Sequence, residues 1–326
     1  MPEPITYLEA IKQGMWEEME RDESVFILGE DVGVYGGAFR VTEGMLERFG
    51  EMRVIDTPIS ESLIVGAASG AALMGMKPIA EMQFIDFISC AFDQITNFAA
   101  TCFYRCGEPL PIVIRGPAGG GTHGGPFHSK NVESIFFNTP GLKIVQPATV
   151  YDAKGLMKSA IRDPNPVIYL EHKLLYRRIK DTIPEDDFTV PIGEARIARG
   201  GRDISVITYG AMVWSALEAA EKLSKEDGIE LEVVDLRSIL PYDKDMILDS
   251  VKRTNRAIIL HEATLTGGPG GEFASFIAEN GFDYLDAPVV RVAAPDTPVP
   301  YSPPLENFFL PNAERLIKAV RKLAEY

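Results

Sequence analysis

The side chains best suited to chemistry lie in a glycine-rich stretch, RGPAGGGTHGGPFHSKN, at residues 115–131. The stretch follows a short apolar run and contains His123 and His128. Glycine-rich backbone after a strand is how α/β proteins bring main chain close to a ligand. A zinc site needs three or four ligands, and the stretch contains no Asp, Glu or Cys to join the two histidines. We therefore expect an acid/base or oxyanion-stabilising histidine, with a solvent-facing loop histidine as the alternative.

A second candidate is Glu61, in the segment IDTPISESLIVGAASGAALMGM at residues 55–76. Pro58 and Ser60 mark a turn into a helix of apolar and small residues, which we expect to be buried with another backbone close by. A carboxylate beside so much apolar surface must be paired, protonated or bonded to a ligand. The alternative is an exposed glutamate in the first helical turn, favoured by the helix dipole.

Aromatic residues gather in the segment 81–107, and their spacing resembles a helical stripe. Such a stripe is more often part of a core than of a cofactor pocket. The first two members follow a strand end, where they offer an apolar wall for a planar heterocycle. The set comprises Phe84, Phe87, Phe92, Phe98, Phe103 and Tyr104.

The elements that must position these residues alternate between strands and helices. A first helix is predicted from Tyr7 to about Arg21, because apolar residues recur there at three- and four-residue steps. Short β-branched runs predict strands at 25–30, 78–84, 111–116, 142–147 and 166–171. This alternation indicates a mostly parallel, helix-covered sheet.

A second, smaller α/β domain is predicted after an acidic, proline-containing linker at residues 181–191. Strands are expected at 204–210, 230–236, 256–262 and 288–295, with helices near 214–225 and 243–254. The predicted domains are residues 1–185 and 192–326, both within the usual size range.

Composition narrows the classes of function. Of the 326 residues 46% are hydrophobic and 24% charged, which is typical of a globular protein. The net charge of −15 argues against nucleic acid as a partner, and the apolar runs are too short to cross a membrane. Three cysteines and an N-terminal segment without targeting features suggest a reducing compartment. We expect a cytoplasmic protein, or a mitochondrial matrix protein if this is a mature organellar form.

Several separated segments resemble, in order and over essentially the whole chain, the β subunits of the thiamine-diphosphate-dependent decarboxylase component of 2-oxo acid dehydrogenase complexes. They are LGEDVG (28–33), DTPISE (56–61), EMQFIDF (81–87), the glycine loop ending in His128-Ser129, residues 140–166, VVDLRSILPYD (233–243) and HEATLTGG (261–268). Any one of these matches is weak. Together they make the resemblance specific.

The resemblance implies a transketolase-like fold, with a pyrimidine-binding domain followed by a transketolase C-terminal domain. It also implies an α2β2 heterotetramer with thiamine diphosphate between α and β, docked on a lipoyl-bearing acyltransferase core. The expected activity is oxidative decarboxylation of a 2-oxo acid with reductive acylation of the lipoyl group.

By the same resemblance, Glu61 hydrogen-bonds the aminopyrimidine nitrogen of the coenzyme and promotes removal of the thiazolium proton. His128 is similar to the histidine beside the reacting carbon, and Phe84 to a residue on the substrate side. His123 has no such counterpart in many relatives and is left as a loop residue, and Lys130 stands where relatives usually have glutamine. Further positions implied to line the coenzyme pocket are Glu30, Ile59, Ser60, Gln83 and Phe87.

Two metals follow from the resemblance. Relatives hold a structural potassium ion through backbone carbonyls and one carboxylate, and oxygen ligands suit such a hard cation. The chain contains no Gly-Asp-Gly motif, which in thiamine enzymes holds the magnesium diphosphate, so the α subunit is expected to supply that half of the site. The positions matching the potassium ligands are Ile112, Ala160, Ile161, Asp163 and Asn165.

Alternatives remain open at this stage. A transketolase-type half enzyme shares the fold and the coenzyme glutamate, and an α/β scaffold subunit without activity is the non-enzymatic alternative. Within the family, HEATLTGG and the tail APDTPVPYSP favour a branched-chain 2-oxo acid over pyruvate, with an acetoin-cleaving enzyme as a further alternative.

Overall fold

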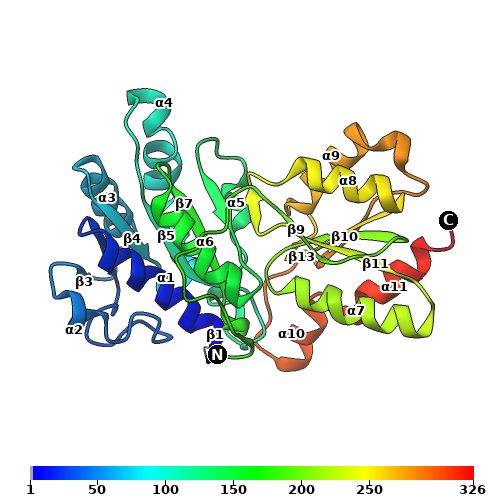
Figure 1. Ribbon diagram of the computed structural model, residues 1–326, viewed down its shortest axis with the longest axis horizontal. Helices are drawn as coiled ribbons and strands as arrows, with labels where there is room; N and C mark the ends of the chain where they lie inside the picture. The colour runs from blue at the N-terminus through cyan, green and yellow to red at the C-terminus, as the bar shows by residue number, and fades with distance from the viewer. Residues whose placement is uncertain (1–2) are drawn as a thin grey trace. The chain divides into compact units, whose positions relative to one another are not determined.

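The computed structural model describes residues 3–326, and the chain divides into two compact units. Unit 1 contains the residues up to Ala118 together with Asn138–Ile192. Unit 2 contains Gly119–Phe137 and Gly193–Tyr326. The glycine loop, which lies within the first domain by sequence order, therefore groups with the second unit. Figure 1 shows the elements of both units along the chain.

Unit 1 is built on parallel strands in the order β6-β7-β5-β4-β2-β3. The strands are β2 (Val25–Gly29), β3 (Val54–Asp56), β4 (Lys77–Glu81), β5 (Val113–Ala118), β6 (Lys143–Val145) and β7 (Val167–His172). The strands β2, β5 and β7 are buried along their whole length, as in a sheet covered on both faces. The predicted parallel sheet is confirmed, and β3 is a strand that the sequence pattern did not reveal.

The helices of unit 1 begin with α1 (Tyr7–Arg21), which confirms the predicted first helix. Its start is fixed by a capping box, in which Thr6 and Glu9 satisfy each other's backbone N–H groups. The helix α6 (Val150–Arg162) packs against α1 (Figure 1), and α3 (Glu61–Leu73) packs on β4.

Shorter elements of unit 1 connect these parts. They are the paired strands β1 (Ile5–Thr6) and β8 (Lys180–Asp181), the helices α2 (Met45–Phe49) and α4 (Cys102–Cys106), the 3-10 helices η1 (Ile85–Ala91) and η4 (Lys173–Leu175), and the π-helix η2 (Gln94–Ala99).

Unit 2 contains a five-stranded sheet in the order β14-β13-β10-β11-β9. Its strands are β9 (Arg196–Arg199), β10 (Ile204–Thr208), β11 (Leu231–Asp235), β13 (Ala257–Thr264) and β14 (Val290–Ala294). Only the edge strand β9 pairs in the antiparallel sense. The four predicted strands are confirmed, and β9 makes the sheet a mixed one.

Helices cover both faces of this sheet: Figure 1 shows α8 (Lys244–Thr254) and α9 (Gly270–Asn280) on one side, and α7 (Met212–Glu226) and α11 (Ala313–Leu323) on the other. The helices predicted near 214–225 and 243–254 correspond to α7 and α8. The remaining elements are α5 (Glu133–Phe137), α10 (Pro303–Phe309), η3 (Gly125–Phe127), η5 (Phe282–Tyr284) and the strand β12 (Ser238–Leu240). Among residues 3–326, no helix is long and apolar enough to cross a membrane.

Candidate active site

Three neighbouring parallel strands of unit 1 end at the same edge of the sheet. Gly29, the last residue of β2, is in register with Asp56 on β3 and with Glu81 on β4. Glu30 follows β2 directly, Glu61 follows β3 after a short turn, and Gln83 follows β4. Carboxyl ends of parallel strands are where α/β proteins bind ligands. The fold thus gathers predicted coenzyme residues from three separate segments.

Glu30 is buried, with 6% of its surface exposed, and its Oε1 has no hydrogen-bond partner. Desolvation raises the pKa of Glu30, and the negative charges of Glu61 and Asp31 raise it further. Glu61 is partly exposed and opens α3 after the N-cap Ser60, whose side chain makes no capping bond. A buried carboxylate oxygen without a donor is costly, so this edge is prepared for a ligand that supplies a hydrogen-bond donor.

The turn after β4 supplies an amide and two aromatic rings. Gln83 donates from Nε2 to Asp31 Oδ2 at 3.1 Å, which links it to the loop after β2. Phe84 packs edge-on against Phe39, with ring centroids 5.6 Å apart. Both Phe84 and Phe87 are partly exposed, as a wall for a planar ring requires.

Asp56, which the sequence did not single out, holds the loop after β2 in place. Its Oδ1 accepts from the Gly33 N–H at 2.6 Å, and its Oδ2 accepts from the Val34 N–H at 3.4 Å. A Cβ at Gly33 would lie 2.7 Å from Asp56 Oδ2, so only glycine allows this approach.

A buried charge cluster lies on β4, β5 and β7 and was also missed. Arg115 on β5 pairs with Glu81, and its Nη2 donates to Glu171 Oε2 at 2.6 Å. Tyr176 donates to the same oxygen at 2.6 Å. Desolvation raises the pKa of Glu81 to about 7, and the charge of Arg115 opposes the shift. The cluster ties β4, which leads into the Gln83–Phe87 turn, to β5 and β7.

Two expectations about burial were wrong. The outer face of α3 is open, with Leu63 54% and Leu73 45% exposed. The aromatic stripe is not core, because Phe103 is 56% and Tyr104 95% exposed, and Phe92 and Phe98 are 42% and 36% exposed. The sequence correctly indicated apolar faces, but this chain by itself does not cover them. Exposed apolar side chains of this kind make α3 and the aromatic segment candidates for an interaction site.

The glycine loop of unit 2 begins at Gly119, whose N–H donates to the Lys130 carbonyl at 3.1 Å. Gly125 has a φ of +65°, and a Cβ there would lie 2.2 Å from the ring of Tyr301. Both the positive φ and the close approach of the Tyr301 ring exclude a residue with a side chain at position 125. His128 follows the 3-10 turn η3 and is partly exposed, so its ring is accessible within this unit.

Two carboxylates far away in sequence fix this loop. Glu262 accepts from the Gly120 N–H at 2.7 Å and from Asn131 Nδ2 at 2.9 Å. Glu306 accepts from the Gly121 N–H at 2.9 Å and from the His123 N–H at 3.2 Å. The segment HEATLTGG contains Glu262, whereas no sequence signal marked Glu306.

His123 differs from His128 in its contacts. Its Nδ1 lies 2.6 Å from Glu306 Oε2, and its backbone adopts a φ of +60°. His123 therefore helps to anchor the loop.

The positions matched to a potassium site come together at the carboxyl end of α6. The Ile112 carbonyl accepts from the Val167 N–H at 3.0 Å, and the Ala160 carbonyl accepts from the Asp163 N–H at 3.4 Å. Asp163 accepts from the Asn165 N–H at 2.9 Å and pairs with Lys143. Ile161 is buried beside them. Residues 3–326 contain no cluster of three His, Cys, Asp or Glu side chains suited to a metal, and the potassium ion stays a prediction.

The edge in unit 1 fits an aminopyrimidine ring by its chemistry. Glu30 and Glu61 offer carboxylates to ring nitrogen and amine groups, and Phe84 and Phe87 offer apolar faces. The orphaned Oε1 of Glu30 is the observation that calls for such a donor.

Comparisons with known proteins agree with this geometry. The family model "Transketolase, pyrimidine binding domain" matches residues 3–179, and "Transketolase, C-terminal domain" matches residues 193–316. The pyrimidine-binding match supports the involvement of thiamine diphosphate. Among solved structures, a split-gene transketolase described as an inactive beta4 tetramer superposes with a TM-score of 0.80 at 23% identity, covering 99% of both chains. The predicted transketolase-like fold is therefore confirmed.

Curated relatives identify the family. The 2-oxoisovalerate dehydrogenase subunit beta of Bacillus subtilis (strain 168) is 51% identical over 325 residues, covering 99% of both chains. The pyruvate dehydrogenase E1 component subunit beta of Staphylococcus aureus (strain COL) is 45% identical over 324 residues, with the same coverage. The chain therefore belongs to the β subunits of 2-oxo acid dehydrogenases, enzymes of the oxidoreductase class, as the sequence motifs predicted.

Proposed function

We propose that this chain is the β subunit of a thiamine-diphosphate-dependent dehydrogenase that decarboxylates a 2-oxo acid and transfers the acyl group to a lipoyl group. The observation that carries the proposal is the edge where β2, β3 and β4 end together. It combines Glu30, Glu61 and the Gln83–Phe87 turn, and it leaves a buried carboxylate oxygen of Glu30 without a donor.

When bound, thiamine diphosphate would supply a nucleophilic carbon for reaction with the 2-oxo group of the substrate. Glu61 holds a proton at its carboxyl group and exchanges it with the pyrimidine ring nitrogen. The neighbouring carboxylate Glu30 supports this role, because desolvation and the charge of Glu61 raise the pKa of Glu30 and so favour a proton at this edge. Ile59 and Ser60, together with Gln83, Phe84 and Phe87, would line the ring when it is bound, and Ile59, 84% exposed in this chain, would be covered by the α subunit.

His128 donates and accepts the proton needed at the substrate and during transfer to the lipoyl group. A histidine suits this work because its ordinary pKa lies close to physiological pH. The loop that carries it is held by Glu262 and Glu306, so the imidazole starts from a restrained backbone.

An α subunit completes the coenzyme site in an α2β2 tetramer. The chain lacks a Gly-Asp-Gly motif for magnesium diphosphate, and a diphosphate without its metal is not held in a dry site. The open face of α3, with Leu63 and Leu73, and the exposed Tyr104 provide apolar surface for such a partner. A lipoyl acyltransferase core is the expected acceptor and docking partner.

The substrate proposed is a branched-chain 2-oxo acid such as 3-methyl-2-oxobutanoate. Greater identity to the Bacillus subtilis 2-oxoisovalerate dehydrogenase subunit, 51%, than to the Staphylococcus aureus pyruvate dehydrogenase subunit, 45%, supports this choice. A structural potassium ion near Asp163 and a cytoplasmic location are parts of the same proposal.

The test is reconstitution with the α subunit from the same organism. The complex is assayed with magnesium and thiamine diphosphate on pyruvate, 3-methyl-2-oxobutanoate, 4-methyl-2-oxopentanoate and acetoin, using an artificial electron acceptor. We expect turnover only with both subunits, and the highest kcat/KM with the branched-chain acids.

Two outcomes would overturn parts of the proposal. Magnesium-dependent coenzyme binding and turnover by this chain alone would show that the site is complete without an α subunit. A preference for pyruvate or acetoin would refute the substrate assignment while leaving the family intact.

A further inference from the structure

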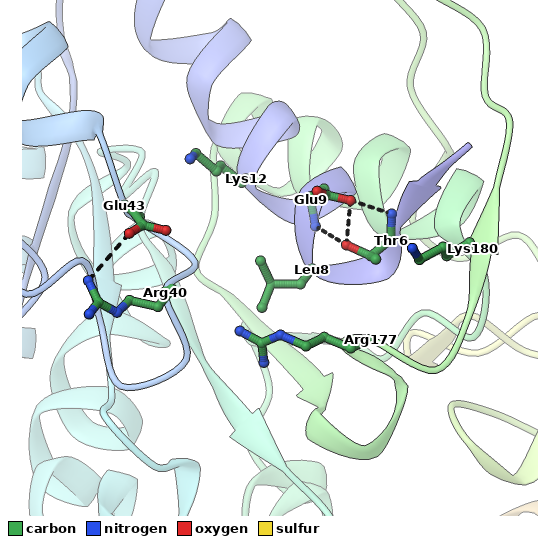
Figure 2. Close-up of a pocket in the computed structure, with 8 residues that line it drawn as sticks. All are labelled: Thr6, Leu8, Glu9, Lys12, Arg40, Glu43, Arg177 and Lys180. Atoms are coloured by element: carbon green, nitrogen blue, oxygen red, sulfur yellow. Dashed lines mark hydrogen bonds and ion pairs between the residues drawn. The ribbon is translucent and has the colours of Figure 1, made fainter. Parts of the chain in front are cut away.

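A pocket of about 340 Å³ in unit 1 has no role in the function proposed above. Three segments line it: the start of α1, the loop after β2, and the chain that leads into β8. Figure 2 shows Leu8 at its centre, Arg177 extending beneath Leu8 toward Arg40, and Lys12 and Lys180 on opposite sides. We call it the basic pocket, lined by Thr6, Leu8, Glu9, Lys12, Arg40, Glu43, Arg177 and Lys180.

The charges of the basic pocket are not balanced. Four cationic side chains face two carboxylates, which leaves an excess of two positive charges. In the described residues, no carboxylate oxygen lies within 4.0 Å of the charged groups of Lys12, Arg177 or Lys180. Such a local excess is unusual on a chain with a net charge of −15, where carboxylates outnumber cations.

The two carboxylates of the pocket are only partly available to the cations. Glu9 Oε2 accepts from both the N–H and the hydroxyl of Thr6 at 2.7 Å. These hydrogen bonds lower the pKa of Glu9, and the charges of Lys180 and Lys12 lower it further. Glu43 lies 3.4 Å from Arg40, with both side chains largely exposed, so this pair contributes little. The cationic side chains of the basic pocket are therefore not neutralised by strong ion pairs within the pocket, and they remain available to an anionic ligand.

Both guanidinium groups are oriented before any ligand binds. Arg40 donates to the Tyr35 carbonyl at 2.9 Å and lies over the Tyr35 ring, 4.8 Å from its centroid. Arg177 donates to the Phe39 carbonyl at 3.1 Å. A guanidinium held in this way keeps further N–H groups for an oxyanion and loses less entropy on binding.

We propose that the basic pocket binds the phosphate group of a small phosphorylated metabolite. The planar N–H forks of arginine match phosphate oxygens, and an excess of two positive charges matches a phosphate monoester dianion. The volume lies within the range of small-molecule sites. The site is separate from the coenzyme edge, and its test does not depend on the proposed function.

Binding would also restrain the loop that joins the pocket to the coenzyme edge. Arg40 belongs to the segment 31–43, in which the Gly37 N–H donates to the Asp31 carbonyl at 2.8 Å and Thr42 Oγ1 donates to the Val32 carbonyl at 2.7 Å. Asp31 follows Glu30 directly. Slower hydrogen exchange in residues 31–43 is therefore a second signature of an occupied pocket.

Isothermal titration calorimetry of the full chain with inorganic phosphate tests the proposal, with sodium chloride at equal ionic strength as the reference. We expect saturable one-to-one binding that weakens at least about tenfold in Arg177→Met and in Lys180→Met. Arg178→Met is the matched control, because Arg178 is the exposed neighbour that does not line the pocket. Thermal unfolding without ligand verifies that each variant is folded.

A parallel titration with glycerol 3-phosphate distinguishes an esterified phosphate from free phosphate. Tighter binding of the ester, with slower exchange in residues 31–43, supports a phosphorylated metabolite. Four results would each overturn the proposal. They are the same affinity in wild type and Arg177→Met, a loss of affinity in Arg178→Met as large as in Arg177→Met, binding that does not saturate, and tighter binding of free phosphate than of its ester.

Discussion

Replacing Glu306 by alanine should release the glycine loop that carries His128. The Glu306 side chain is fully buried, and its carboxylate accepts from the backbone N–H groups of Gly121 at 2.9 Å and His123 at 3.2 Å. The imidazole of His123 lies 2.6 Å from the same carboxylate. Removing the carboxylate leaves this part of the loop without its partner on α10.

The size of the effect follows from these contacts. A hydrogen bond to a charged group contributes about 1.5–3 kcal/mol. The freed N–H groups of Gly121 and His123 lie on a partly exposed loop and regain hydrogen bonds to water, and the half-exposed His123 ring adds little. We therefore expect a net loss of about 2–3 kcal/mol in the local stability of the loop, which corresponds to an opening equilibrium increased about 30- to 150-fold.

Hydrogen–deuterium exchange of the folded chain measures this opening directly. Amides of residues 119–131 should exchange faster by the factor above, while those of β10 remain protected. Glu306→Gln, which keeps one acceptor oxygen, should be intermediate, and the exposed Glu314→Ala is the control. Unchanged exchange of the loop in Glu306→Ala would refute the view that Glu306 restrains it.

Three further predictions concern single side chains. Glu61→Gln should leave folding intact but lower decarboxylation by about 10²–10⁴-fold, because an amide cannot relay the proton. Steady-state turnover of the coenzyme-saturated complex measures this rate, and near wild-type turnover would show that Glu61 does not have this role. His128→Ala should slow acylation of the lipoyl domain at least as much as decarboxylation, whereas His123→Ala should be mild; single-turnover measurement of both steps checks this, and small equal effects would contradict it. Burial lowers the pKa of His261 from 6.5 to about 4, so the folded protein favours the neutral ring. The neutral ring's contribution to the free energy of unfolding is therefore complete above pH 6.5 and is lost as the pH falls toward 4. Urea unfolding measures the free energy of unfolding at pH 7.5 and at pH 5. The decrease in this free energy between the two pH values should be about 2 kcal/mol smaller in His261→Gln than in wild type. Equal decreases in the two proteins would contradict this linkage.

The sequence predicted most of the residues at the candidate coenzyme edge, partly from local patterns and partly from the family resemblance. Glu61 was singled out because it opens an apolar helix, whereas Glu30, which follows a buried strand, was predicted only from the resemblance. The parallel pairing of β2, β3 and β4 then brings them to one edge. Asp56 escaped notice because its role is a contact with the Gly33 N–H, which no local pattern announces.

By itself, the sequence determined the alternation of strands and helices, the two α/β domains and the family, all of which depend on periodicity and on ordered motifs. Only the tertiary structure decided which groups hold the glycine loop. Gly120 and Glu262 are 142 residues apart, and Gly121 and Glu306 are 185 residues apart. It also decided that the apolar face of α3 is open, with Leu63 54% exposed. Periodicity reports that a face is apolar, but whether the same chain covers it depends on long-range packing, which short sequence patterns do not encode.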